Sequence, residues 1–87
     1  MLTVTEGALD RLSRKLVHRN AADDVALRFT RKTGGWKLRP DHPRPTDKTF
    51  THEGKEVLVL DEAVSRAMAD RTLDVRQTKA GPRLTLR

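Results

Sequence analysis

The segment TRKTGGWKLRP, from Thr30 to Pro40, holds the residues best suited to contact a ligand or a partner. It combines two adjacent glycines and the only tryptophan of the chain with four cations; these residues are Arg31, Lys32, Gly34, Gly35, Trp36, Lys37 and Arg39. Cations beside an aromatic ring could clasp phosphate, stack on a base or grip an acidic protein, whereas two glycines could simply form a hairpin turn. The segment is not a P-loop, because it lacks the G-x-x-x-x-G-K-S/T spacing and leads into a predicted strand.

Residues for catalysis or metal binding are scarce elsewhere. The chain has no cysteine, which excludes disulfides, thiolate catalysis and cysteine-bound metal in these residues. His18, His42 and His52 fall on different predicted elements without the spacing of a metal-binding pair, so they are expected to face solvent, and a histidine-ligated metal carrier is the least favoured interpretation. Ser13 and Ser65 lie in predicted helices without a neighbouring base. We therefore expect no enzyme and no bound cofactor or metal.

Length and composition predict one small domain over residues 1–87. The net charge of +6 would attract nucleic acid or acidic proteins, but the basic residues are spread along the chain and only one tryptophan is available for stacking. No apolar run is long enough to span a membrane, and no signal peptide is visible. A cytoplasmic protein without a membrane contact is the expectation. The carboxylate pairs Asp23–Asp24 and Asp70–Asp74 are attributed to caps and turns.

Hydrophobic spacing predicts the elements that carry the Thr30–Pro40 segment. A short strand at Leu2–Val4 leads to Thr5, a good N-cap residue, and then to Leu9, Leu12 and Leu16 at helical spacing. Val25, Leu27 and Phe29 alternate with Ala26, Arg28 and Thr30, the pattern of a half-buried strand that enters a Gly34–Gly35 turn. The chain then returns as a strand through Trp36 and Leu38, until the prolines of RPDHPRP end it in an irregular loop.

The remaining elements complete an α+β domain. They are strands at Thr49–His52 and Val57–Leu60, a helix from the cap residue Asp61 to about Met68, and strands around Leu73–Val75 and Leu84–Leu86. The predicted order is β-α-β-β-β-β-α-β-β, with two helices and small, mostly antiparallel β-sheets.

Several segments in this order resemble one family. The segment LTVTEGALDRL is similar to the first strand, the following threonine and the first helix of that family. The segment VALRFTRKTGGWK is similar to its LR…T-S-G-C-S-G segment, with Leu27-Arg28, Thr33 and Gly35 in register. EVLVLDEAV resembles a buried strand followed by an Asp-capped helix, and LDV at Leu73–Val75 resembles its LDF. From Leu2 to about Leu86 the chain therefore resembles the A-type iron–sulfur carriers, the IscA/HesB-like proteins. The resemblance implies a HesB-like domain that forms dimers or larger assemblies.

The chain departs from this family at the ligands. The family has a cysteine directly after the hairpin glycine, and this chain has Trp36 at that position. The family also has two cysteines in a Cys-Gly-Cys tail, and no residue up to Arg87 corresponds to them. Iron–sulfur clusters need thiolate ligands, so carrier chemistry within these residues is not expected. The sequence predicts a cofactor-free, HesB-like domain that binds an acidic protein partner or a second copy of itself through the basic hairpin around Trp36. The alternative is a weak nucleic-acid-binding module that uses the same Gly-Gly-Trp hairpin.

Overall fold

The computed structural model describes residues 2–87, and within them the predicted element order is confirmed. The elements are β1 (Thr3–Val4), α1 (Glu6–His18), β2 (Ala26–Lys32), β3 (Gly35–Asp41), β4 (Lys48–His52), β5 (Lys55–Leu60), α2 (Glu62–Ala67), β6 (Thr72–Thr78) and β7 (Gly81–Leu86). Both helices begin as the sequence predicts: the side chains of Thr5 and Asp61 accept hydrogen bonds from the backbone N–H groups of Ala8 and Val64. Neither helix within residues 2–87 is long and apolar enough to cross a lipid bilayer.

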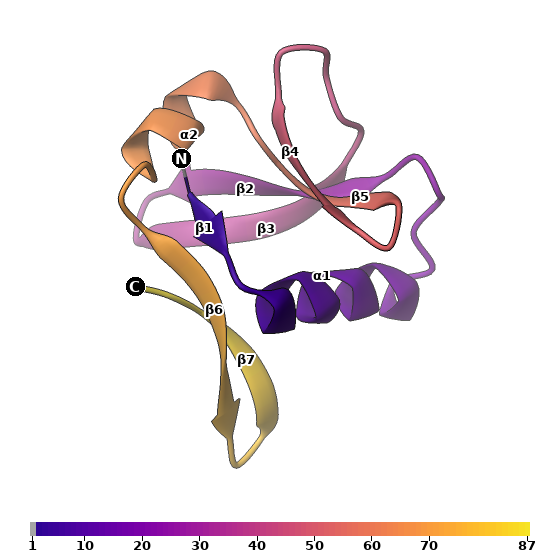
Figure 1. The fold of residues 1–87 in the computed structure, drawn as a ribbon, viewed down its shortest axis with the longest axis vertical. Coiled ribbons are helices and arrows are strands. Elements are labelled where there is room, and N and C mark those ends of the chain that lie inside the picture. The colour runs from indigo at the N-terminus through magenta and orange to yellow at the C-terminus, as the bar shows by residue number, and fades with distance from the viewer. Residues whose placement is uncertain (1) are drawn as a thin grey trace.

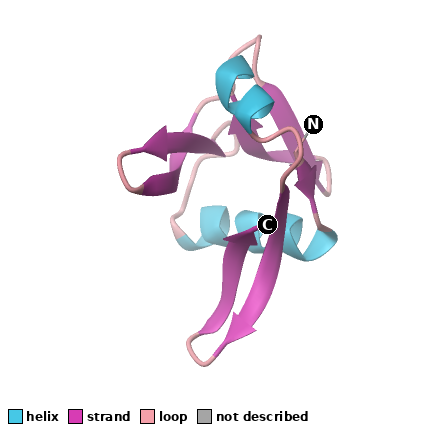
Figure 2. Ribbon diagram, turned by 90° about the vertical axis from the view of Figure 1, so that its left-hand side faces the viewer, coloured by secondary structure: helices cyan, strands magenta, loops and turns pink. Residues whose placement is uncertain are grey.

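The strands form two mixed sheets (Figure 1). One sheet has the order β3-β2-β5-β4 and the other the order β1-β6-β7. The three hairpins β2–β3, β4–β5 and β6–β7 are antiparallel, whereas β2–β5 and β1–β6 pair in parallel. The β6–β7 hairpin runs past α1, and its turn lies far from the four-stranded sheet (Figures 1 and 2).

Helix α1 joins the two sheets through its apolar face. Ala8, Leu12 and Leu16 are buried and belong to one core cluster with residues of β2, β5 and β6. The first turn of α1 comes so close to β6 that a Cβ at Gly7 would lie 2.8 Å from Cγ1 of Val75. Glycine at this position therefore allows the helix to lie directly on the smaller sheet.

The contact between α1 and β6 also corrects the interpretation of Asp74. This residue lies within β6, where its carboxylate accepts hydrogen bonds from the Thr5 hydroxyl at 2.8 Å and from Nη2 of Arg87 at 2.9 Å. The Thr5 hydroxyl, followed by the Val75 backbone N–H, lowers the pKa of Asp74. Asp74 thus ties the start of α1 to the smaller sheet and is neither a helix cap nor a turn residue.

Strand β2 is buried on both faces, where the sequence pattern predicts burial on one. Ala26, Leu27, Arg28 and Phe29 are all buried. Strand β2 lies at the centre of its sheet between β3 and β5, and the connection from β3 to β4 places contacts on the Arg28 side. A central strand covered on both faces has no solvent side, so the alternation of polar and apolar residues misled the prediction.

Strand β3 extends beyond the predicted stop at the prolines. It continues through Pro40, which pairs with Leu27, and ends at Asp41. Because β3 is at the edge of the sheet, the missing N–H of proline does not leave a neighbouring strand without a partner.

Candidate interaction site at the Gly-Gly hairpin

The turn that joins β2 to β3 requires its glycines. Lys32 pairs with Gly35, so Thr33 and Gly34 form the two-residue connection and Gly35 opens β3. The φ angles of Gly34 and Gly35 are 90° and 141°, in a region that other residues rarely adopt. A Cβ at either position would meet no atom within 4 Å. The backbone conformation therefore demands glycine here, and the turn is open to solvent.

The sheet divides the predicted contact residues between its two faces. Trp36 pairs with Arg31, and Lys37 pairs with Thr30, so the ring of Trp36 and the side chain of Lys37 lie on opposite faces. Arg31 shares the face of Trp36, whereas Lys32 and Arg39 share the face of Lys37. The structure thus brings Arg31 and Trp36 together, and the other three cations border the hairpin from the far side.

Trp36 contacts the core and remains half-buried. Its ring centroid lies 5.2 Å from that of Phe29, with the rings tilted by 45°. The guanidinium carbon of Arg31 lies 5.8 Å from the Trp36 centroid, within the range of a cation–π contact. The ring is therefore held between a buried phenylalanine and an exposed arginine, and part of it remains available to a partner.

A hollow of about 730 Å³ lies beside the ring, and two of its residues could not be foreseen. Ala67, at the end of α2, and Arg71, before β6, line it together with residues 31–36. These two residues come from more than 30 positions further along the chain, and no local pattern links them to the hairpin. Arg71 adds another cation, and its Nε donates to the Arg87 carbonyl oxygen at 3.1 Å.

The cations around the turn of the hairpin have no carboxylate partner in the part of the chain that the structure describes. Among residues 2–87, Arg31, Lys32, Lys37 and Arg39 make no ion pair, and no acidic residue lines the hollow beside Trp36. The site therefore has the chemistry of a cationic surface with one aromatic anchor.

The opposite end of the same hairpin carries a buried ion cluster that the sequence did not reveal. The side chain of Arg28 is 8% exposed and donates through Nε to Asp41 at 2.7 Å and through Nη2 to Asp47 at 2.6 Å. Asp47 comes from the loop before β4, and its side chain is 1% exposed. The proline-rich segment, interpreted as an irregular loop, thus carries the carboxylate that allows Arg28 to be buried.

Hydrogen bonding within this cluster shifts the pKa of every member toward the charged form. The Arg28 side chain is the main cause of the lowered pKa values of Asp41 and Asp47, although desolvation opposes the shift. The backbone N–H groups of His42 and Arg44 lower them further. The hydrogen bond with Asp47, in turn, is the largest cause of the raised pKa of Arg28.

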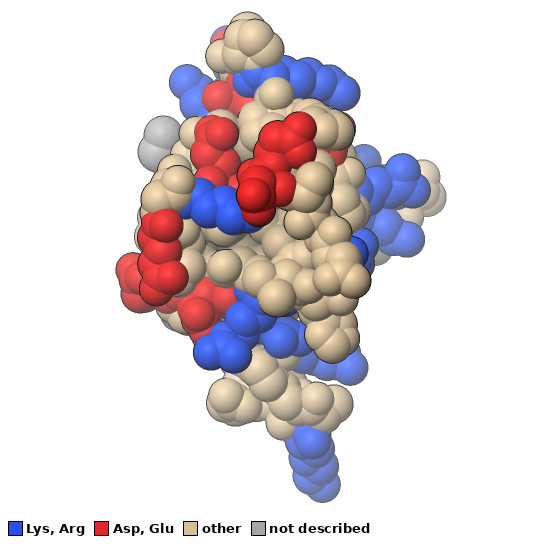
Figure 3. Space-filling view, turned by 90° about the vertical axis from the view of Figure 1, so that its right-hand side faces the viewer, with Lys and Arg blue, Asp and Glu red and all other residues tan. Residues whose placement is uncertain are grey.

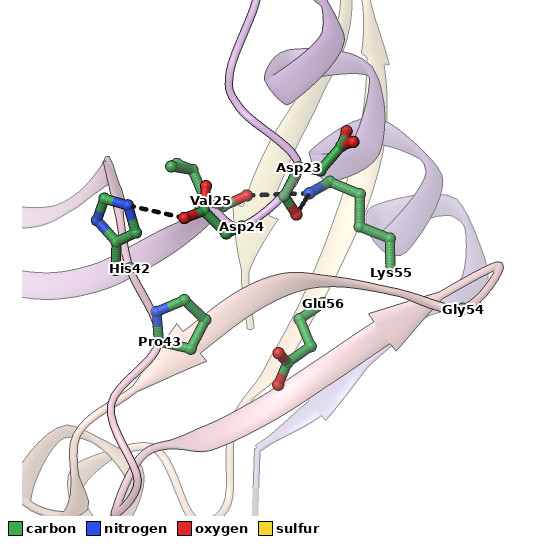
Figure 4. Close-up of a pocket in the computed structure, with 8 residues that line it drawn as sticks. All are labelled: Asp23, Asp24, Val25, His42, Pro43, Gly54, Lys55 and Glu56. Carbon is green, nitrogen blue, oxygen red and sulfur yellow. Dashed lines mark hydrogen bonds and ion pairs between the residues drawn. The ribbon is translucent and has the colours of Figure 1, made fainter.

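A second hollow opens near this buried cluster. Figure 3 shows a group of acidic side chains in the middle of one face, with basic side chains below it. In the close-up, Lys55 reaches across the hollow and donates to the carbonyl oxygens of Asp23 at 2.7 Å and Val25 at 3.1 Å (Figure 4). Nε2 of His42 lies 3.3 Å from Oδ2 of Asp24. Lys55 and His42 therefore hold neighbouring segments of the chain together, which is a structural role.

Known structures share this fold. SufA of Escherichia coli, described as involved in the biosynthesis of iron–sulfur clusters, matches 99% of this chain and 83% of its own, with 23% identity and a TM-score of 0.75. IscA with a [2Fe-2S] cluster matches 100% of this chain and 84% of its own, with 17% identity and a TM-score of 0.66. The fold is that of the A-type iron–sulfur carriers. A protein from Aquifex aeolicus gives a TM-score of 0.69 at 21% identity, over 99% of this chain and 89% of its own. No family model and no curated protein sequence matches the chain.

The residues of this carrier fold do not fit an iron–sulfur cluster. Residues 1–87 contain no thiolate donor, and the hollow beside Trp36 is lined by cations, glycines, threonine and alanine. Across the part of the chain that the structure describes, no group of three or more histidine and acidic residues is arranged to hold a metal ion.

One histidine departs from the expectation of solvent-facing imidazoles. His18 and His42 are exposed, but the His52 side chain is only 11% exposed. Its ring lies against α1, with Nδ1 3.5 Å from Glu6 and Nε2 3.8 Å from Asp10. The turn of the β4–β5 hairpin brings Glu53 to 3.9 Å from the same Nε2. His52 thus connects this hairpin to the helix.

Proposed function

We propose that this domain is a cofactor-free relative of the A-type carriers that acts by binding another protein. One observation carries the proposal. The hairpin that in the resembling family bears a cysteine ligand here presents Trp36, unpaired cations and no soft ligand. Such a loop suits a protein contact better than a metal, because aromatic residues and arginine dominate binding energy at interfaces. The domain has no catalytic role in this proposal, and its expected location is the cytoplasm.

The partner is expected to be acidic around an apolar anchor point. Arg31 and Arg71 line the hollow beside Trp36, and complementary carboxylates on the partner would both steer the approach and fix the orientation. Trp36 would lose its remaining exposed surface in the complex, with the cations as the polar rim. The partner is a different protein or a second copy of this chain.

The test measures binding and stability on the same variants. Trp36→Ala should reduce self-association in analytical ultracentrifugation, or capture of an acidic protein from the native cytosol, by about tenfold or more. Because Trp36 also packs on Phe29, the melting temperature should fall as well. Binding is therefore compared per folded molecule, at a temperature where both proteins are folded.

Charge variants provide the matched control. Arg31→Glu should weaken binding and make it less sensitive to salt, whereas Lys48→Glu, on β4 outside the hairpin, should change neither. Lower stability with unchanged binding in Trp36→Ala would refute the contact role of the ring. Salt-sensitive binding of mixed oligonucleotides, lost in Arg31→Glu, would favour the nucleic-acid alternative.

The cofactor-free part of the proposal has its own test. Protein purified from iron-rich medium should be colourless and carry no stoichiometric iron. A brown chromophore after anaerobic reconstitution, lost on replacement of His42 or His52, would contradict it.

A further inference from the structure

A hollow of about 460 Å³ lies away from the Gly-Gly hairpin, where α1, the edge strand β3 and the β6–β7 hairpin meet. Arg11 and Lys15 of α1 line one wall and Arg83 of β7 another; the apolar and small residues between them are Leu38, Ala80, Pro82 and Leu84. The three cations come from elements far apart in the sequence, and no acidic side chain lines the space. Figure 3 shows basic side chains in this lower part of the molecule, down to the end of the β6–β7 hairpin.

One hydrogen-bond donor of Arg11 has no acceptor in this position. Its Nε is buried and has no hydrogen-bond partner. Within residues 2–87, neither Arg11, Lys15 nor Arg83 forms an ion pair. The nearby Arg14 differs, because its Nε donates to Asp10 at 2.9 Å. A buried guanidinium donor without an acceptor is rare in native proteins, since it loses water without replacing it, and its presence indicates a missing acceptor.

The electrostatics of α1 point to the same missing group. Arg11, Lys15 and Arg19 are spaced four residues apart, so they follow one another along one face of the helix. Burial, followed by repulsion from Arg11 and Arg19, lowers the pKa of Lys15. Like charges at this spacing destabilise a helix, and an anion bound between them would remove that cost.

We propose that this hollow is a binding site for a phosphate group. Arg11 and Lys15 of α1 and Arg83 of β7 all line it, and a phosphate offers them about two negative charges and three strong acceptor oxygens. A single carboxylate carries one charge and would leave part of the cluster uncompensated. The guanidinium groups of Arg11 and Arg83 suit phosphate oxygens, and Lys15 supplies a compact charge. This site and the proposed protein contact have only strand β3 in common, which contributes Leu38 here.

The test titrates the 87-residue protein with inorganic phosphate, with sodium chloride adjusted to constant ionic strength. Saturable chemical-shift changes are expected at the backbone amides of Arg11, Lys15 and Arg83. Phosphate should also raise the pKa of the Lys15 ammonium, which a purely stabilising salt effect would not do. If phosphate moves these signals no more than chloride does, the proposal is wrong.

Matched variants localise the binding. Arg11→Gln and Arg83→Gln should each weaken phosphate binding by about tenfold or more, because each removes a charge-assisted hydrogen bond. Arg14→Gln removes the same charge from the same helix outside the hollow and should change the affinity by less than about twofold. If all three variants weakened phosphate binding equally, the binding would depend only on the net charge of the protein, and the proposal would be wrong. If Arg11→Gln does not fold, Arg83→Gln on the exposed hairpin still decides the outcome.

Competition identifies the source of the phosphate. Two neighbouring phosphodiesters together carry the same two charges. A single-stranded oligothymidylate that displaces inorganic phosphate from the wild type, and binds weakly to Arg11→Gln, would therefore assign the site to a nucleic-acid backbone. An oligothymidylate that does not compete would assign it to a small phosphate-bearing ligand. Polyglutamate that competes as well as the oligothymidylate at equal charge would show a general anion surface and refute phosphate recognition.

Discussion

The two ends of the β2–β3 hairpin use arginine in opposite ways. At one end Arg28 is buried and engaged by Asp41 and Asp47, whereas at the other Arg31 lies exposed beside Trp36 with no carboxylate. Both arginines are on the same strand, three residues apart. Their difference comes from what covers them: the β3–β4 connection closes over Arg28, and nothing in residues 2–87 closes over the turn.

The contrast indicates which charges serve stability and which are available for binding. A buried guanidinium loses its hydration, so it is tolerated only with nearby carboxylates, and removing either partner leaves an uncompensated charge. An exposed guanidinium keeps its water and contributes little to folding. The charges at the hairpin turn can therefore serve recognition without a large effect on the fold.

The largest effect is expected at the buried end. Asp47→Ala leaves Arg28 without its most buried partner and should lower the free energy of unfolding by about 3–5 kcal/mol. Urea denaturation measures this change. A loss below about 1 kcal/mol, the typical value of an exposed pair, would mean that the two ends do not differ in the way proposed.

A core leucine provides the reference for that value. Leu12→Ala removes a fully buried side chain of α1 and should lower the free energy of unfolding by about 2–4 kcal/mol, because it leaves a cavity. The same urea experiment applies. If Leu12→Ala had no effect on stability, the apolar face of α1 would not be the core contact that the structure shows.

Acid should act on the buried end in particular. The pKa values of Asp41 and Asp47 are lowered below the ordinary 3.8, so these carboxylates stabilise the folded state above pH 3.8, and this contribution is lost as the pH falls through their folded-state values. The melting temperature of the wild type should fall between about pH 5 and pH 2. Asp47→Asn should start lower and show a shallower fall over that range. Parallel profiles for both proteins would contradict the role of Asp47.

The smallest effect is expected at the turn. Lys32→Gln and Lys37→Gln remove exposed charges without ion pairs and should change the free energy of unfolding by no more than about 0.5 kcal/mol. A larger loss in thermal or urea unfolding would show that these lysines have a structural partner after all.

Local sequence patterns predicted the helices and strands, but not the side-chain contacts between distant elements. The leucine spacing of α1, the caps Thr5 and Asp61, and the glycines of the β2–β3 turn all act within a few residues, and all were predicted. Asp47 lies 19 residues from Arg28, and Arg71 is still farther from Trp36, so only the tertiary fold brings these pairs together. A polar residue in an alternating strand pattern also gives no sign that a distant loop will cover it. The core could therefore be predicted in outline, and the ion cluster could not.

The parallel pair β1–β6 has a consequence for how the chain folds. Thr3 and Thr72 are register partners, and the hydrogen bond from Thr5 to Asp74 joins residues 69 positions apart. The three antiparallel hairpins close over short stretches of chain, whereas β1 can add to the smaller sheet only after nearly the whole chain has collapsed. We therefore expect β1 to dock after the rate-limiting step. Asp74→Asn weakens the bond that Thr5, the residue after β1, makes to β6, and it keeps the Thr5 cap of α1. It should mainly accelerate unfolding and leave the refolding rate almost unchanged.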